Sequence, residues 1–254
     1  MIKIENFEVV GLEHAIRGMR NPMNSWEKSD SHYCGAEGGW PQDVCNDCIY
    51  FPEDRCLNSV NIPYIVGPND LTLMSKLAKG GPVHAKYRRM ITVYVDITAP
   101  LYWWKEFDTY KVGTVANSCS TMHKIHAKKF EMSDFSTEHL HPISFKCLGF
   151  TIKTLNEWRD SYLVYDKFKS GEVPVSHEAQ DFIDKYSKKD MWWQMIQLLP
   201  SSYNQKRTVM LNYEVLTGIY ESRKNHKLDE WIEFCKWIEK LPYSEIITGG
   251  RSDE

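Results

Sequence analysis

The sequence has no uninterrupted apolar run that approaches the roughly 20 residues of a membrane-spanning helix. Its first residues, Met1 to Asn6, lack the apolar core of a secretory signal peptide. We therefore expect a cytoplasmic protein with no membrane partner. The seven cysteines are an odd number, which fits a reducing compartment better than a set of paired disulfides.

A strong excess of charge of either sign is also missing. Lys and Arg total 31, Asp and Glu total 34, and the formal net charge is −3. Proteins that wrap a nucleic-acid polymer usually have a basic surface, so we expect no such polymer as a partner. A small anionic ligand needs only a few local cations, and the net charge does not bear on it.

The chain does contain enough hydrophobic sequence for a large core. It has 254 residues, 42% of them hydrophobic, and we expect a single domain over residues 1–254. Nine Trp, 14 Tyr and 10 Phe either fill this core or stack on a planar ligand. Strand patterns come early and helical patterns late, which favours an α+β fold with a small central β-sheet packed with long helices.

Local patterns predict the individual elements. The clearest strand covers 88–98, where Ile91, Val93, Val95 and Ile97 share one face, and a shorter strand lies within 2–10. Asn69 and Asp70 are predicted to cap a helix that ends at Gly80. Further helices are predicted over 101–107, 151–169, 177–187, 189–198, 204–224 and 228–241, with a polar loop over 109–120 and a loose tail over 248–254.

An irregular insertion over 21–61 is rich in Gly, Pro, Ser, Asp and Asn. Two of its cysteines have the CxxC spacing of a metal knuckle, and four thiolates would bind structural zinc and order a loop that lacks its own core. Four free thiols, or a disulfide in an oxidising compartment, are the alternatives, and His32 could replace one cysteine as a ligand. The predicted zinc ligands are Cys34, Cys45, Cys48 and Cys56.

A polar segment, 108–123, follows the aromatic helix 101–107. Hydroxyls, amides, an ammonium and backbone N–H groups at a turn suit a phosphate or the edge of a pyrimidine. An ordinary connection with Ser and Thr caps has the same composition, so both interpretations stay open. Its polar side chains are Tyr110, Lys111, Thr114, Asn117, Ser118, Ser120, Thr121 and His123.

A second unusual segment runs from 199 to 223. As a helix it would place Asn212 and Arg223 roughly on one stripe and bring an amide and a guanidinium into a pocket. Arginine is suited to bidentate phosphate binding. The alternative is a surface Arg223 paired with Glu221 or Asp229.

Together these segments resemble the flavin-dependent thymidylate synthases, which methylate deoxyuridylate with FAD in place of a cysteine nucleophile. The stretch 84–123 is similar to that family's succession of a His, a strand, an Ala-Pro turn, an aromatic helix and a signature loop. The stretch 199–231 is similar to its closing Leu-Pro, inward Asn, Leu-rich helix, terminal Arg and Trp-containing helix.

The resemblance implies reductive methylation of a dUMP-like pyrimidine deoxynucleotide, with FAD as cofactor and methylenetetrahydrofolate and NADPH as co-substrates. It also implies a homotetramer with sites between subunits. No protein nucleophile is required, so no catalytic residue is assigned. The implied substrate-binding residues are Ser118, Cys119, Ser120 and Arg223, with Ser120 at the signature Ser. The implied cofactor-binding residues are His84, Tyr110, Lys111, Asn117 and Asn212.

The sequence departs from the family at its signature. Residues 109–111 read Thr-Tyr-Lys where the family has Arg-His-Arg, Ser120 lies one residue too far along, and Met122 replaces an Arg. Lys111, helped by Lys124, remains in place of three cations, and Lys lacks the planar fork of Arg. These departures favour an alternative function, a non-catalytic protein that sequesters or senses a nucleotide. A zinc-stabilised interaction module is a third hypothesis.

Overall fold

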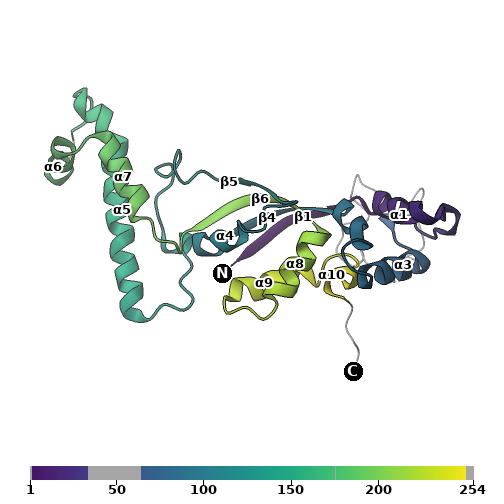
Figure 1. The fold of residues 1–254 in the computed structure, drawn as a ribbon. Helices are drawn as coiled ribbons and strands as arrows, with labels where there is room; N and C mark the ends of the chain where they lie inside the picture. Colours follow the sequence, from purple (N-terminus) through teal and green to yellow (C-terminus); the bar gives the residue numbers. More distant parts are fainter. Residues whose placement is uncertain (1, 34–63, 175, 250–254) are drawn as a thin grey trace, which may run out of the picture. The chain divides into compact units, whose positions relative to one another are not determined.

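The computed structural model describes residues 2–33, 64–174 and 176–249 (Figure 1). In chain order the elements are β1 (Lys3–Val10), α1 (Leu12–Arg20), η1 (Asn21–Met23), η2 (Trp26–Lys28), β2 (His32–Tyr33), β3 (Tyr64–Ile65), α3 (Pro68–Lys79), η3 (Ala85–Met90), β4 (Thr92–Pro100), α4 (Leu101–Phe107), β5 (Val115–Ser118), η4 (Met132–Asp134), α5 (Pro142–Lys169), α6 (His177–Lys185), α7 (Lys188–Leu198), β6 (Asn204–Asn212), α8 (Tyr213–Arg223), α9 (Asp229–Ile238) and α10 (Glu245–Thr248). The η elements are short 3₁₀ helices.

The chain divides into two compact units. Unit 1 comprises Met1–Ile4, Asp96–Thr109 and Ala116–Thr208. Unit 2 comprises Glu5–Val95, Tyr110–Val115 and Val209–Glu254. The expectation of one domain stays a prediction. The zinc ligands predicted at Cys34, Cys45, Cys48 and Cys56, and most of the tail 248–254, lie outside the described residues.

Four strands form a sheet in the order β1-β4-β6-β5, and β2 pairs antiparallel with β3. The alternation predicted in β4 is confirmed, since Val93 and Val95 are buried while Tyr94 between them is 45% exposed. The strand begins later than predicted because residues 85–90 form η3. The clearest sequence pattern therefore forms a strand of the main sheet.

The predicted aromatic helix is α4. Its Trp103, Trp104 and Phe107 are all fully buried, and the Trp104 indole N–H donates to the backbone oxygen of Gln205 at 2.9 Å. These three rings are therefore core side chains and are not exposed for stacking on a ligand.

The long helix predicted over 204–224 is wrong. Residues 204–212 form strand β6, in which Gln205, Val209 and Leu211, all on one side of the strand, are buried. Only α8 is helical, and Asn212 caps it, because its side-chain oxygen accepts from the Val215 N–H at 3.0 Å. The predicted loop 109–120 likewise contains strand β5, exposed along its length.

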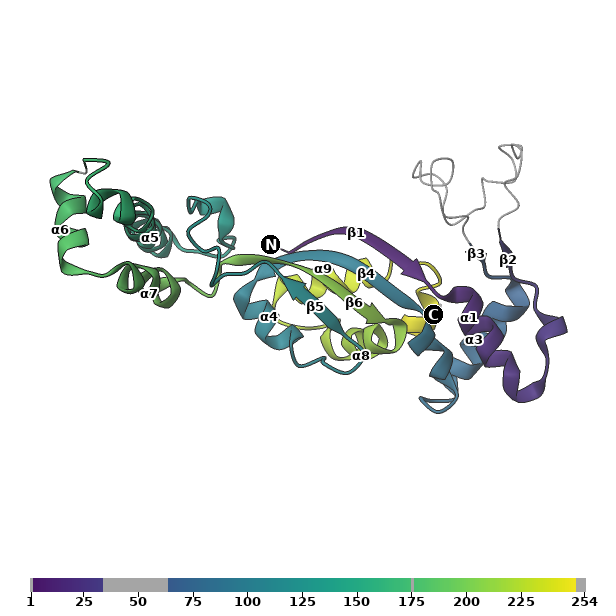
Figure 2. The same cartoon turned by 90° about the horizontal axis from the view of Figure 1, so that it is seen from above.

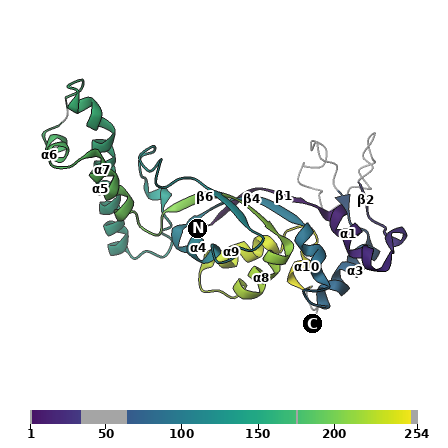
Figure 3. The same ribbon diagram turned by 45° about the horizontal axis from the view of Figure 1, so that its top comes forward.

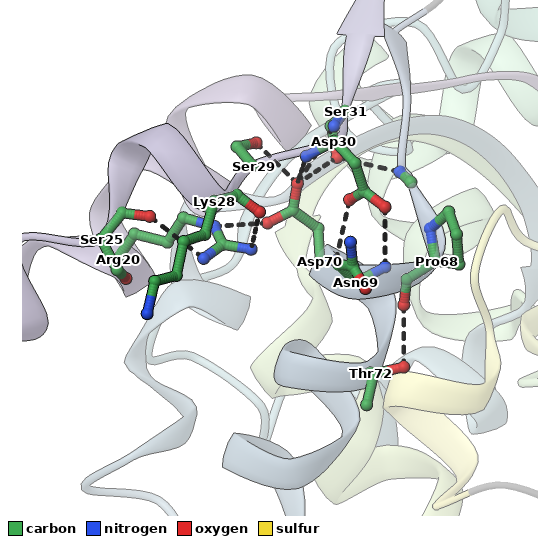
Figure 4. A network of polar contacts seen from close by, with 11 residues as sticks. Arg20, Ser25, Lys28, Ser29, Asp30, Ser31, Pro68, Asn69, Asp70 and Thr72 are labelled. Atoms are coloured by element: carbon green, nitrogen blue, oxygen red, sulfur yellow. Dashed lines mark hydrogen bonds and ion pairs between the residues drawn. The ribbon is translucent and has the colours of Figure 1, made fainter.

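The predicted cap of α3 is also wrong. Gly67 is the N-cap, Pro68 begins the helix, and Asp70 lies in its first turn. The Asp70 carboxylate instead accepts hydrogen bonds from Arg20, Ser29 and Ser31 (Figure 4). This network joins α1, the turn before β2 and the start of α3.

Unit 1 contains a helical bundle in which α5 packs against α7 (Figures 2 and 3). Helix α5 begins at Pro142, earlier than the predicted 151, and His141 caps it. Among the described residues, no helix is both long and apolar enough to cross a membrane. The bundle core consists of Ile125, Phe130, Phe135, Leu148, Ile152, Leu155 and Met195.

In unit 2, helices α8 and α9 cover one face of the strands (Figures 1 and 3). Tyr213, Leu216 and Trp231 are fully buried there, and the Tyr213 N–H donates to the Ile91 oxygen at 3.0 Å. That bond fixes the start of α8 against the residue that precedes β4.

Candidate functional site

The polar segment 110–115 lies against both ends of α8 in unit 2. At one end, the Arg223 Nε donates to the Tyr110 hydroxyl at 2.9 Å. At the other, Gly113 has φ +81°, and a Cβ there would lie 2.9 Å from the Asn212 Nδ2. A side chain at this position would be strained and would collide with the amide. The structure thus brings together two segments that the sequence singled out separately.

Arg223 is the centre of this arrangement. Its guanidinium carbon lies 4.8 Å from the ring centroid of Trp231 and 5.8 Å from that of Tyr110. Its Nη1 is 2.9 Å from the Nε2 of His226. We call Tyr110, Arg223, His226 and Trp231 the Arg223 cage. Trp231 is fully buried and Arg223 is half-buried, so the aromatic rings set the plane of a cation that still reaches the surface.

Sequence reasoning missed His226. Its ring meets Trp231 edge-on, with centroids 6.3 Å apart, and its Nδ1 accepts from the Leu228 N–H at 3.2 Å. The available signal was its position just after the end of α8 and before α9. The position in the sequence does not show which way the imidazole points, because its contact with Trp231 depends on how the elements pack.

The predicted cofactor residues in unit 2 take different positions. Tyr110 belongs to the cage, and Asn212 caps α8. Lys111, which follows Tyr110 in the sequence, is exposed. His84 is exposed at the start of η3, packed beside Gly80. Asn212 is thus a capping residue rather than part of an inward helical stripe, while Lys111 remains an exposed cation.

Several buried polar atoms of unit 2 have no hydrogen-bond partner within the part of the chain that the structure describes. They include the Nε of Arg88, the Oγ1 of Thr114 and the Oε2 of Glu214. The Arg88 Nη1 and the Glu214 Oε2 are 3.7 Å apart, too far for a good hydrogen bond. Buried polar atoms are nearly always paired, so these atoms favour a polar partner from outside the chain or ordered water.

The predicted substrate residues 118–120 lie in unit 1. The Cys119 N–H donates to the Lys206 oxygen at 2.9 Å, and its own oxygen accepts from the Gln205 amide at 2.8 Å. The Ser120 hydroxyl accepts from the His123 N–H at 2.9 Å and so caps a turn. Ser118 and Asn117 are exposed on β5. The composition of the segment left open whether its hydroxyls bind a ligand or cap a turn, and in the structure the Ser120 hydroxyl caps a turn.

Arg207 supports this part of unit 1 and was not singled out by sequence. Its guanidinium lies 4.2 Å from the ring centroid of Trp104 and donates to the Asp108 carboxylate at 2.7 Å. Its Nε donates to the Gln205 side-chain oxygen at 3.0 Å. Because the Gln205 amide holds Cys119, Arg207 orients the end of β5.

Cys235 is the one cysteine of unit 2 among the described residues, and its environment does not favour a nucleophile. Burial raises the pKa of the Cys235 thiol to about 12, with Glu239 adding to the effect. A thiol with such a pKa stays protonated at neutral pH and is a poor nucleophile.

No protein-family model matches this sequence, and no curated protein matches it. Solved structures do. Thymidylate synthase X from Helicobacter pylori, crystallised with FAD and dUMP, aligns with 97% of this chain and 96% of its own, at a TM-score of 0.55 and 14% identity. A second Helicobacter pylori structure, of the flavin-dependent thymidylate synthase complexed with FAD and dUMP, aligns with 96% of this chain and 95% of its own, at 0.54 and 14%.

A UMP/dUMP methylase from Streptomyces cacaoi bound with 5-Br dUMP aligns at a TM-score of 0.49 and 9% identity, covering 98% of this chain and 96% of its own. At these identities the first two likenesses establish the fold. The chain has the α+β fold of the flavin-dependent thymidylate synthases, as the sequence predicted.

Proposed function

We propose that this protein binds a pyrimidine deoxynucleotide of the dUMP type in unit 2, and that Arg223 contacts it. The Arg223 cage is the observation that carries this proposal. A guanidinium oriented by Trp231 and Tyr110 presents its N–H donors in a fixed plane, which suits phosphate and pyrimidine oxygens. The shared fold supports the proposal, because the Helicobacter pylori proteins were crystallised with dUMP.

We propose further that the nucleotide is reductively methylated, with methylenetetrahydrofolate as one-carbon donor and NADPH as reductant. FAD, when bound, supplies the hydride chemistry. The residues of unit 2 that would hold it are His84, Tyr110, Lys111 and Asn212. The buried Arg88 Nε and Thr114 Oγ1, which have no hydrogen-bond partner among the described residues, fit a ligand rich in hydroxyl and carbonyl groups. The protein itself would hold the nucleotide in the orientation that the reaction needs. Asn117, Ser118, Cys119 and Ser120 stay separate predictions in unit 1.

A specific observation favours the alternative, a nucleotide-binding protein without this chemistry. The Tyr110 hydroxyl is held by Arg223, and Lys111 is an exposed ammonium without the fork of an arginine. Each charge-assisted hydrogen bond that the family signature would make, and that this sequence cannot, removes about 1.5–3 kcal/mol of binding free energy. This loss of binding free energy would weaken the binding of a large anionic cofactor more than the binding of a nucleotide.

The test of nucleotide binding is calorimetric titration with dUMP. We expect the wild-type chain to bind and Arg223→Ala to lose affinity by at least about tenfold, since a charged hydrogen bond is removed. Arg89→Ala, which removes an exposed arginine of the same unit, is the matched control and should bind normally. Equal affinities of wild type and Arg223→Ala would remove the assignment.

The test of the chemistry is the flavin itself. Purified protein, or protein mixed with FAD and freed of excess, should show flavin absorbance if the enzymatic proposal holds. Colourless protein that takes up no FAD while still binding dUMP would contradict the enzymatic proposal and favour the non-catalytic function. We place either function in the cytoplasm and in a homotetramer, whose mass sedimentation measures against the 29.8 kDa chain.

A further inference from the structure

Two helices of the bundle in unit 1 hold the segment 119–126, which follows β5, by its backbone. The indole N–H of Trp192, in α7, donates to the Met122 backbone oxygen at 2.8 Å. The Nε of Arg159, in α5, donates to the His126 backbone oxygen at 3.0 Å. Both acceptors are main-chain oxygens, so these two bonds fix the path of the chain itself.

The same segment is joined to the predicted substrate residues. The Ser120 hydroxyl accepts from the N–H groups of Met122 and His123, at 3.3 Å and 2.9 Å. The residue that Trp192 holds is therefore part of the turn that Ser120 caps. Farther along, Ile125 is 5% exposed and belongs to the bundle core, which gives the segment an apolar anchor beside its polar ones.

Helix α7, which carries Trp192, is firmly placed. Met191 and Met195 are both fully buried, one just before Trp192 and one almost a turn after it. Ser187 and Asp190 form a capping box at the start of the helix. In Figures 1 and 2, α7 lies beside α5, and the two helices are in contact. A donor carried by such a helix leaves its acceptor little freedom to move.

We infer that Trp192 and Arg159 are positioning residues, which hold residues 118–120 in the geometry that binds the nucleotide. The inference rests on the proposed function and on the predicted substrate roles of these three residues. Each positioning residue acts through a main-chain oxygen of the segment. A segment that is ordered before the ligand arrives loses less conformational entropy on binding, so its release should weaken the affinity.

The first experiment removes the indole donor. Trp192→Phe keeps an aromatic ring and loses the N–H, and we expect the affinity for dUMP to fall about fivefold, as the loss of one neutral hydrogen bond implies. Trp193→Phe is the matched control, because it changes the neighbouring indole of α7, which is 39% exposed, and should bind dUMP like wild type. Unfolding midpoints verify that both variants fold.

The second experiment removes the guanidinium. Arg159→Met loses a hydrogen bond from a charged donor, and we expect the affinity for dUMP to fall about tenfold. Asp160→Ala is its control. It removes the exposed carboxylate that accepts from the Arg159 Nη1 at 2.7 Å, but it leaves the Nε bond to His126 in place. The control should bind dUMP like wild type.

A spectroscopic measurement separates positioning from a contribution to stability alone. In protein labelled with ¹⁵N-tryptophan, the indole signals of Trp192 and Trp193 are assigned by their loss in the two Phe variants. We expect dUMP to shift the Trp192 signal and to leave the Trp193 signal in place, because the Trp192 N–H donates to the segment. A Trp192 signal that dUMP does not move would overturn the inference.

The affinities distinguish failure of this inference from failure of the proposed function. If Trp192→Phe and Arg159→Met bind dUMP like wild type, while Arg223→Ala is defective, this inference alone is overturned. A wild-type chain that does not bind dUMP would overturn the proposed function and the inference with it. Weaker binding by the two variants, with normal binding by both controls and a shifted Trp192 signal, is the result we expect.

Discussion

At the residue scale, Arg20 and Asp70 form a deeply buried ion pair, with side-chain exposures of 5% and 0%. The Arg20 Nε donates to the Asp70 Oδ1 at 2.6 Å, and its other nitrogens donate to backbone oxygens of Ser25 and Lys28. Ser31 donates to the second Asp70 oxygen (Figure 4). Because both charges are satisfied, removing one partner leaves the other buried and unpaired.

We therefore expect Asp70→Ala to lower the free energy of unfolding by about 3–5 kcal/mol, the usual cost of breaking a buried pair from one side. Urea unfolding measures it. The double variant Arg20→Met with Asp70→Leu is the control and should recover much of the loss, since it leaves no buried charge. Asp70→Ala as stable as wild type would contradict the role given to this pair.

The same pair predicts a pH dependence. Burial works to raise the pKa of Asp70, but hydrogen bonds from Ser29, Ser31 and Arg20, together with the Arg20 charge, outweigh it and hold the pKa below 3.8. A carboxyl whose pKa is lower in the folded state stabilises fully above its unfolded value and loses that stabilisation as pH falls through the folded value. The stability gap between wild type and Asp70→Asn should therefore narrow below pH 3.8.

At the element scale, the segment 110–115 and helix α8 act as one piece, tied at Tyr110 with Arg223 and at Gly113 with Asn212. Gly113 is the point where the backbone comes closest to the capping amide. Its positive φ and its lack of a Cβ are both needed there. Any change that lifts this segment should disturb the Arg223 cage through Tyr110.

Gly113→Ala tests this coupling. We expect a loss of unfolding free energy of about 1–3 kcal/mol from backbone strain and the collision with Asn212, together with weaker dUMP binding. Gly171→Ala is a matched control, because Gly171 has φ +77° but nothing within 4 Å of the added Cβ. The control should show the strain alone. An equal loss in both variants, with unchanged dUMP affinity, would argue against the coupling.

At the scale of the whole molecule, the zinc prediction concerns a segment outside the described residues. Within the described ranges, no group of three or more His, Cys, Asp or Glu side chains could hold a metal. His32, the proposed substitute ligand, lies in the exposed strand β2, which pairs with β3. Any zinc bound by the protein should therefore depend on the cysteines of the insertion.

Metal analysis of protein purified without chelators should find about one zinc per chain, as expected for a single four-cysteine site. Cys45→Ser should lower this content and the stability, because a structural zinc contributes directly to folding. Cys147→Ser, which removes an exposed cysteine of α5, is the control and should leave both unchanged. Protein without zinc would end this hypothesis.

The sequence by itself determined the elements whose burial follows a local period. In β4, alternate residues are apolar, and in α4 the large rings Trp103, Trp104 and Phe107 recur on one side. It also determined the resemblance in two segments, and the structural likeness confirms the fold which that resemblance implied. Patterns of this kind are encoded within a few residues, so no distant contact is needed to recognise them.

Only the tertiary structure decided that residues 204–212 form a strand and that Arg223 meets Tyr110. The strand exists because β4 and β5 flank it, and those partners are far away in the chain. Arg223 and Tyr110 are 113 positions apart, and Arg223 and His226 both contact the ring of Trp231, which belongs to another helix. Contacts at such separations depend on how the elements pack, which no local pattern encodes.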